Sequence, residues 1–344
     1  MNDIFDGSTL YIGAYGFGNL GDELCLLDTM KRFPSRTSHV VSNQGYIENF
    51  VNCDEIILGS PFNNSKHGDR FLFGKHCDFD RIILGGGLVL GTKGSQDTIT
   101  ILHWAWKSGK EVIIHNVGVG GANFFTGRWF TPSIHQFLDE VEFSVRDELS
   151  LSLINERWPL CRSKEIETTY FMESDGETDF SLAESILPVG KKLLGISIVH
   201  TEEHLSFLNA SKGSIVALLN RYKGYTVVPI VSTIHSSYVK GSEKWQNDAQ
   251  GFTLFSKMFL DDFEIAGAEM LDTIFWYENM SPQKLKGVIS SCDFLISQRK
   301  HNCVNAITHQ IPTVFLGSRM DDSITRSWDA VKKRVHPDSY LLEI

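Results

Sequence analysis

Near the start of the chain, four glycines and two acidic residues share one short loop. The segment "YIGAYGFGNLGDELCLLDTMKRF" covers residues 11–33; an apolar run enters the loop and a helical pattern leaves it. Such glycines either relieve strain in a tight turn or let a ligand lie close to the backbone. Because free N–H groups at a helix start attract anions, the loop is also a candidate phosphate cradle. It lacks usable GxGxxG spacing and a GK[ST] ending, which argues against dinucleotides and P-loop nucleotides.

The polar residues of this loop allow more than one role. Asn19 can donate a hydrogen bond to a ligand, and Gly21 leaves room for one. Asp22 and Glu23 would repel a phosphate placed beside them. They either cap the following helix, where a negative charge is favourable, or accept hydrogen bonds from the hydroxyls of a neutral second substrate. The loop alone leaves these alternatives open.

Two further segments of the first half carry candidate site residues. In "LGGGLVLGTKGSQD", residues 84–97, Gly85, Gly86 and Gly87 end an expected strand, either as a turn or as bare backbone under a ligand. In "FSVRDELS", Arg146 and Asp147 stand between a strand and a helix. Either the two side chains form a local ion pair of little energetic value, or Arg146 points at a ligand and Asp147 caps the helix.

The segment "DFLISQRKHNCVNAITHQIPTVFLG", residues 293–317, carries the strongest chemical signal of the second half. Gln298, Arg299 and His301 follow an apolar run and precede a helical pattern, so we expect them at the carboxyl end of a strand. Arginine offers a planar fork for a carboxylate or phosphate. Histidine can carry a proton at neutral pH, although a histidine in a loop is often simply solvated.

The bulk composition is that of a soluble globular protein. The 344 residues are 42% hydrophobic and 22% charged, with a net charge of -10 that argues against non-specific nucleic-acid binding. The N-terminus lacks a signal-peptide pattern and no run of 18 apolar residues occurs, so we expect a cytoplasmic protein. The six cysteines are scattered without a CxxC pair, which predicts no metal site and fits a reducing compartment.

Short apolar runs alternate with helical patterns along both halves, which predicts parallel sheets covered by helices. The expected strands are residues 9–15, 38–43, 55–60, 80–87, 110–120, 142–147, 192–199, 225–232, 272–278, 293–299 and 312–317. The expected helices are residues 22–33, 95–109, 130–141, 148–158, 211–222, 251–260, 281–292 and 301–310.

An acidic, Gly- and Pro-broken stretch at residues 172–190 divides the pattern and is the expected linker. The prediction is an α/β protein of two Rossmann-like domains, 1–175 and 190–320, that face a cleft in a GT-B-like architecture. Residues 321–344 are expected to contribute a C-terminal helix, centred on 325–337, that packs back on the N-terminal domain.

Taken in order, "GAYGFGNLGDEL", "ILGGGLVL", "SVRDELS" and "CDFLISQRKHNCVNAITHQIPTVFL" resemble the polysaccharide pyruvyl transferase family. The resemblance covers roughly residues 10–320, and its most specific parts are the GNLGDE loop and the R-x-H segment. The sequence departs from the family pattern in four places, one of which is the absence of the expected "DP" from "TTYFMESDG", after the helix that follows Arg146. Lys300 replaces a usual leucine, Gln310 stands where glycine is usual, and "GSRMDDS" at 317–323 replaces a turn with tyrosine and lysine.

The resemblance implies a transferase that forms a pyruvate ketal on two hydroxyls of a surface-polysaccharide sugar or of its lipid-linked precursor. Phosphoenolpyruvate is the implied donor, phosphate is released, and no cofactor is needed. Arg146 and Arg299 would clamp the donor, and His301 would protonate its methylene carbon. Asp22, Glu23 or His235 would serve as base. A lipid-linked acceptor would also bring weak, peripheral association with the inner membrane.

Two other functions remain open on the sequence. A GT-B glycosyltransferase that uses a nucleotide sugar would share the fold and the glycine-rich loops. A non-catalytic glycan-assembly protein would account for the departures at Lys300 and residues 317–323.

Overall fold

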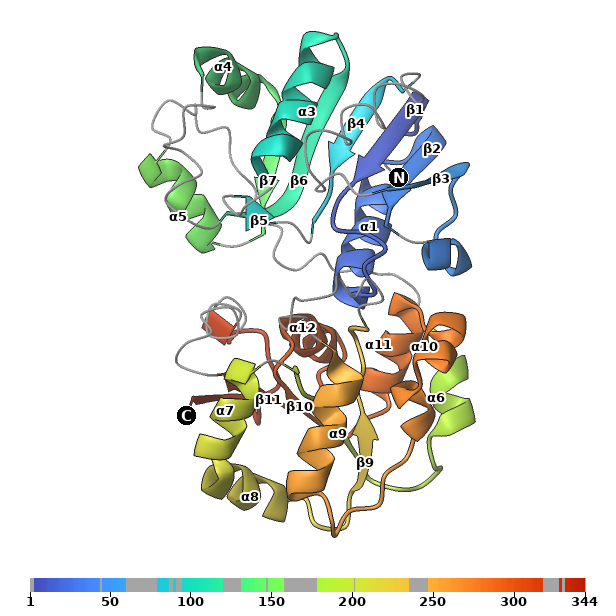
Figure 1. Ribbon diagram of the computed structural model, residues 1–344, viewed down its shortest axis with the longest axis vertical. Coiled ribbons are helices and arrows are strands. Elements are labelled where there is room, and N and C mark those ends of the chain that lie inside the picture. The colour runs from blue at the N-terminus through green and yellow to red at the C-terminus, as the bar shows by residue number, and fades with distance from the viewer. Residues whose placement is uncertain are drawn as a thin grey trace. The chain divides into compact units, whose positions relative to one another are not determined.

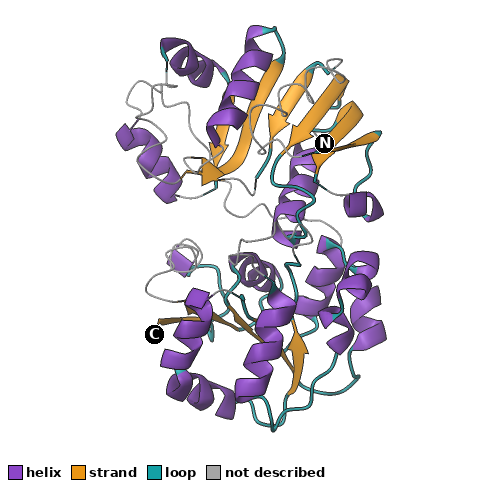
Figure 2. Ribbon diagram, in the orientation of Figure 1, coloured by secondary structure: helices purple, strands orange, loops and turns teal. Residues whose placement is uncertain are grey.

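The chain forms two compact units (Figure 1). Unit 1 consists of Met1–Phe17 and Asp22–Ser174, and unit 2 of Gly18–Gly21 and Asp175–Ile344. The computed structural model describes residues 3–43, 45–59, 79–86, 89–90, 95–119, 131–146, 148–157, 178–200, 202–234, 247–317, 328–329 and 332–343. In both units helices alternate with strands along the chain (Figure 2).

Unit 1 is built on a parallel sheet with the strand order β3-β2-β1-β4-β6, extended by β5 and β7, which both pair with β6. This order reverses direction between β1 and β4, as in doubly wound nucleotide-binding folds. The strands are β1 (Phe5–Ile12), β2 (Ser35–Ser42), β3 (Glu55–Leu58), β4 (Arg81–Leu84), β5 (Val89–Leu90), β6 (Glu111–Val119) and β7 (Glu142–Val145). The helices are α1 (Leu20–Arg32), η1 (Gly45–Asn49), α3 (Ser95–Lys107), α4 (Pro132–Glu140) and α5 (Glu148–Arg157).

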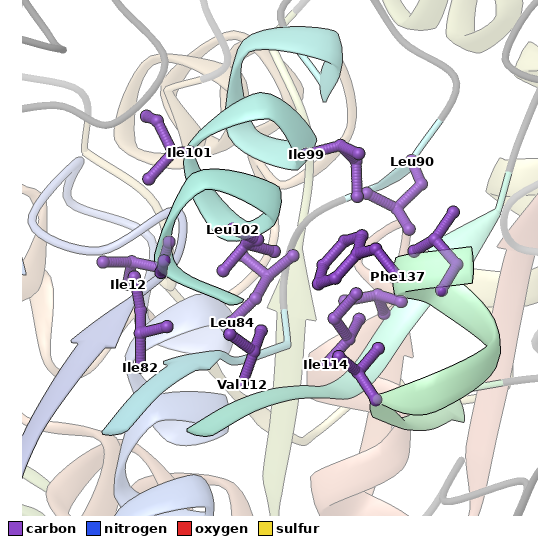
Figure 3. Packing of buried hydrophobic residues seen from close by; sticks show 14 of the residues in the cluster. Ile12, Ile82, Leu84, Leu90, Ile99, Ile101, Leu102, Val112, Ile114 and Phe137 are labelled. Atoms are coloured by element: carbon purple, nitrogen blue, oxygen red, sulfur yellow. The ribbon is translucent and has the colours of Figure 1, made fainter. Parts of the chain in front are cut away.

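Alternating side chains of the central strands fill two cores, one on each face of the sheet. On one face, residues of β1, β4 and β6 pack with helices α3 and α4 (Figure 3). In that view Leu102 of α3 lies over Leu84 and Val112 of the sheet. The intervening residues, such as Tyr11 and Ile83, pack on the other face with α1 and η1. Burial on both faces explains why these strands read as continuous apolar runs.

Unit 2 contains a second parallel sheet with the order β12-β11-β10-β8-β9. Its strands are β8 (Leu193–Ser197), β9 (Thr226–Pro229), β10 (Phe294–Ser297), β11 (Thr313–Gly317) and β12 (Tyr340–Glu343). Its helices are α6 (Ser181–Ile186), α7 (Glu202–Ala210), α8 (Lys212–Asn220), α9 (Asp248–Phe259), η3 (Ala268–Leu271), α10 (Thr273–Asn279), α11 (Pro282–Ser290) and α12 (Lys300–Thr308).

Three expectations about elements in unit 2 were wrong. The expected strand at 272–278 is helix α10, because Asp272 caps it by accepting a hydrogen bond from the Phe275 amide at 2.8 Å. Part of the expected linker forms helix α6, with Leu182 and Ala183 buried.

The third error concerns the C-terminus. Trp328 and Asp329 are helical as expected, but the described residues 332–339 form turns and bends, and the chain then enters strand β12, which pairs in parallel with β11. A continuous helix over 325–337 is therefore excluded, and the chain end contributes to the sheet of unit 2.

Candidate functional site

The motifs identified in the sequence lie at the carboxyl ends of strands that flank the reversal of strand order in each sheet. In unit 1 these are β1 and β4, which the glycine loop and Gly85–Gly86 follow. In unit 2 they are β8 and β10, and Gln298–His301 follows β10. Ligands of open α/β sheets bind at such positions. The sheet topology therefore favours both loop regions as ligand sites.

The glycines of unit 1 make room for the protein's own side chains. A Cβ at Gly13 would collide with the ring of Tyr15, and one at Gly85 would collide with the Tyr15 hydroxyl. A Cβ at Gly86 would lie 3.0 Å from the Cβ of Cys25 and 3.1 Å from the Asn116 amide nitrogen. At Gly85 and Gly86 the space that a side chain would take is thus filled by Tyr15, Cys25 and Asn116, while a ligand on this backbone stays a prediction.

Glu23 is a fully buried carboxyl group at the start of α1. Its Oε1 accepts hydrogen bonds from the Gly16 amide at 2.8 Å and the Tyr46 hydroxyl at 2.7 Å. Its Oε2 is buried and has no hydrogen-bond partner among the described residues. Burial raises the pKa of Glu23 to about 8, so the group is largely protonated at neutral pH. The Glu23 carboxyl thus fixes the glycine loop through its hydrogen bond from the Gly16 amide, and in its neutral form it carries a proton.

Asp22 and Arg146 are the other predicted site residues of unit 1. Asp22 is 8% exposed, so it presents little surface to solvent. The backbone amide of Arg146 donates to the Val117 carbonyl at 3.1 Å. Its guanidinium lies against Gly118, where a Cβ would come within 2.7 Å of the Arg146 Cζ. The absence of a side chain at Gly118 thus lets the arginine lie across the end of β6.

The segment Gly18–Gly21 of the glycine loop packs within unit 2. The Leu20 amide donates to the Ser232 carbonyl at 2.9 Å, and the Ile234 amide donates to the Gly18 carbonyl at 2.8 Å. Gly18 has a φ of +75°, and a Cβ there would collide with the Ile234 carbonyl. Glycine is required at this position by both its backbone conformation and its close contact.

Asn19 caps helix α1. Its Oδ1 accepts from the Gly21 amide at 3.2 Å and from the Thr233 hydroxyl at 3.4 Å. Sequence reasoning gave the capping role to Asp22 or Glu23, but Asn19 immediately precedes the first helical residue and has the geometry of an N-cap.

Gly21 brings the glycine loop against His301, which lies 280 positions later in the chain. A Cβ at Gly21 would collide with the imidazole Nδ1 of His301. The imidazole ring of His301 therefore occupies the space beside the Gly21 backbone, where the sequence predicted room for a ligand. The two most specific motifs of the sequence thus lie in direct contact within unit 2.

Arg299 does not present a free fork to a ligand. Its Nε donates to Asp248 Oδ1 at 2.9 Å, and one terminal nitrogen donates to the same oxygen at 2.7 Å. Asp248 is completely buried, and the Arg299 side chain is 13% exposed. We expected the whole Arg299 fork to face the donor, but one edge of the guanidinium binds the internal carboxylate of Asp248 instead.

Gln298 and Asn302 support the same region through internal hydrogen bonds. The Gln298 Oε1 accepts from the Val199 amide at 3.0 Å, so it fixes the chain after β8 and is 4% exposed. The Asn302 Nδ2 donates to the Ser197 hydroxyl at 2.9 Å and to the Ser232 hydroxyl at 3.2 Å. Its Oδ1 is buried and has no hydrogen-bond partner in the described part of the chain.

Several predicted residues lie outside the described part of the chain, namely Gly87, Asp147, His235 and residues 318–323. Among the described residues no group of three or more His, Cys, Asp or Glu side chains could hold a metal ion. Within the same residues, none of the helices has the length and apolar character needed to cross a membrane.

Sequence reasoning missed Asp248, Asn302 and Tyr46. Asp248 stands in "WQNDAQG", three residues before the point where the helix was expected to begin, so it falls outside the expected elements. Only its place at the start of α9 reveals it as a buried carboxylate. Asn302 and Tyr46 carry no sequence signal that would single them out.

Comparison of the sequence with protein-family models and with curated proteins gives no match. Among solved structures, the chain is similar to a candidate UDP-N-acetylglucosamine 2-epimerase from Listeria monocytogenes. The TM-score is 0.50 at 8% identity, with 91% of this chain and 79% of that chain covered.

Two further similarities involve the UDP-GlcNAc 2-epimerase of Methanocaldococcus jannaschii and the ADP-heptose LPS heptosyltransferase II of E. coli. The first has a TM-score of 0.49 at 12% identity, covering 97% of this chain and 96% of that chain. The second has a TM-score of 0.43 at 12% identity, covering 97% and 90%. At these identities the comparison concerns the fold alone. The chain has a GT-B-like α/β fold with two parallel sheets.

Proposed function

We propose that this protein is a transferase that modifies a sugar, with phosphoenolpyruvate as donor and a pyruvate ketal as product. The observation that supports it most is the packing of Gly21 against His301, because it brings together the two motifs on which the family resemblance rests. A histidine held beside a helix start at the carboxyl end of a parallel strand is well placed for acid–base chemistry.

The proposed reaction needs one proton on carbon and two new carbon–oxygen bonds. His301 gives a proton to the methylene carbon of the donor, and the adjacent carbon becomes oxocarbenium-like. Two sugar hydroxyls then bond to that carbon, its bond to the phosphate oxygen breaks, and phosphate leaves. One hydroxyl proton replaces the proton used on carbon, and the second leaves with phosphate or solvent. Arg146 is the proposed partner of an anionic group of the donor.

A GT-B glycosyltransferase that uses a nucleotide sugar is the second candidate. The structural comparisons favour it, because the similar proteins are named for UDP-GlcNAc and ADP-heptose. The two candidates share an anionic donor and a sugar acceptor, and they differ in the donor's leaving group. With either donor we place the enzyme in the cytoplasm, where a lipid-linked acceptor would hold it weakly at the inner membrane.

The donor is tested by binding and by product. We expect phosphoenolpyruvate to raise the melting temperature, whereas UDP, GDP and ADP do not. We also expect phosphate release from phosphoenolpyruvate only when a suitable glycoside is present, tested with a panel of free and lipid-linked sugars. Stabilisation by a nucleoside diphosphate with no effect of phosphoenolpyruvate would replace this proposal with the second candidate. Phosphate release would exclude a non-catalytic assembly protein.

The role of His301 is tested by substitution. His301→Ala should lower turnover by roughly 10²–10⁴, the usual contribution of a general acid, while donor affinity changes little. His336→Ala is the matched control, because the His336 imidazole makes a local contact in a turn region of unit 2, where its Nδ1 accepts from the Asp338 amide at 3.2 Å. Near wild-type turnover in His301→Ala would end the acid assignment.

A further inference from the structure

Asp248 is the buried centre of a hydrogen-bond network in unit 2. Its Oδ1 accepts two hydrogen bonds from Arg299, at 2.9 and 2.7 Å. Its Oδ2 accepts from the Ser232 amide at 3.1 Å, the Ser232 hydroxyl at 2.9 Å and the Thr233 amide at 3.0 Å. The carboxylate therefore joins the residue that precedes α12 to the chain that follows β9.

Capping of its own helix does not explain Asp248. The N-cap of α9 is Asn247, whose side chain accepts from the Gln250 amide at 3.2 Å. Asp248 instead directs its carboxylate toward groups on other elements and is 0% exposed. A buried charge is costly unless it is paired and hydrogen-bonded, and here both conditions are met.

The backbone that Asp248 holds is the same backbone that binds the glycine segment Gly18–Gly21. Ser232 gives its amide and hydroxyl to Asp248, while its carbonyl accepts from the Leu20 amide at 2.9 Å. Thr233 gives its amide to Asp248, while its hydroxyl donates to the Asn19 Oδ1 at 3.4 Å. Each of these two residues thus connects Asp248 directly to the glycine segment.

We infer that Asp248 is a positioning residue, which orients the Arg299 guanidinium and, through Ser232 and Thr233, holds Gly18–Gly21 beside His301. It acts through other groups and needs no contact with substrate. The catalytic consequence rests on the proposed function, whereas the structural consequence does not.

The first test is hydrogen exchange in the full-length protein carrying Asp248→Asn. An asparagine of the same shape has only one acceptor oxygen, so its NH₂ group must face donors either from Arg299 or from Ser232 and Thr233. We expect amides in peptides covering Gly18–Gly21 to exchange about 10-fold faster, although the substitution lies more than 200 residues away in the sequence. Unchanged exchange would overturn the inference.

The second test is kinetic. Asp248→Asn should raise the KM for phosphoenolpyruvate about 10-fold or more, because it disturbs Arg299, whose other guanidinium edge we place on the donor. It should lower kcat less, through the weaker hold on Gly18–Gly21 beside His301. In an Arg299→Lys background the same substitution should have a much smaller effect on KM. Equal effects in both backgrounds would refute the link to Arg299.

Asp272→Ala is the control for a loss of stability alone, since the Asp272 side chain caps α10 by accepting from the Phe275 amide, a bond outside this network. It should lower the melting temperature without changing either exchange at Gly18–Gly21 or KM. If it reproduces both effects, Asp248 is merely structural. If Asp248→Asn does not fold, Ser232→Ala replaces it and should show smaller changes in the same direction.

A failure of the proposed function is distinguishable from a failure of this inference. A wild-type protein inactive with every donor would refute the function, and exchange at Gly18–Gly21 would still decide the role of Asp248.

Discussion

Substitution of Gly21 by alanine gives a sharp test of the contact between the glycine loop and His301. Gly21 is the second residue of helix α1, so helix propensity alone predicts a gain of about 1 kcal/mol in the free energy of unfolding. The added methyl group, however, would collide with the His301 imidazole. Forcing extra volume into a packed site costs about 1–3 kcal/mol. We therefore expect Gly21→Ala to destabilise the protein by about 0–2 kcal/mol.

The same substitution should become favourable once the imidazole is removed. In a His301→Ala background the methyl group has space, and the propensity gain of up to about 1 kcal/mol should appear. The double-mutant cycle should thus give a coupling of about 1–3 kcal/mol between Gly21 and His301. Thermal and denaturant unfolding of the four proteins measures it, with about 2–4 °C expected for each kcal/mol.

Gly18→Ala is the matched control in this cycle. Gly18 has a φ of +75° and faces the Ile234 carbonyl, so alanine is strained there whether or not His301 is present. It should destabilise both backgrounds by the same amount. An equal cost of Gly21→Ala in both backgrounds would show that Gly21 and His301 do not share this space, and the reasoning would fail.

Two further predictions concern stability. Burial raises the pKa of Glu23 from 4.5 to about 8 in the folded protein. The folded state is therefore most stable, as far as Glu23 is concerned, below pH 4.5, and this contribution to the free energy of unfolding is lost as pH rises through 8. Glu23→Gln, which mimics the protonated group, should remove this loss and unfold at higher denaturant concentration than wild type at pH 8.5, but not at pH 5. Trp276→Phe should cost about 2–4 kcal/mol, because it removes a buried ring and the 2.8 Å hydrogen bond to the Val231 carbonyl. Trp104→Phe, at a position 40% exposed, should stay within about 0.5 kcal/mol in the same urea titration.

Most of the fold could be predicted from local patterns, because the central strands β4, β6, β8 and β10 are buried on both faces and read as apolar runs between helical patterns. The carboxyl ends of the central strands were thus located as the regions that carry the motifs. The helix expected at 281–292 is also confirmed as α11, which Ser281 caps and Pro282 begins, since capping depends on neighbouring residues alone. The strand expected at 272–278 failed for the complementary reason: its aromatic, β-branched run resembled a strand, and the cap of Asp272 was not recognised.

The amino-acid sequence by itself indicated most of the strands and helices, and which glycines, arginines and histidines lie at their ends. Only the tertiary structure decided what those residues touch. Spacing along the chain could not show that His301 fills the space at Gly21, that Tyr15 fills the space at Gly85, or that Arg299 pairs with Asp248. These contacts join residues tens to hundreds of positions apart, and they form only when the chain has folded and packed them together. Burial, which turns Glu23 into a neutral acid, likewise arises only when the chain has packed around it.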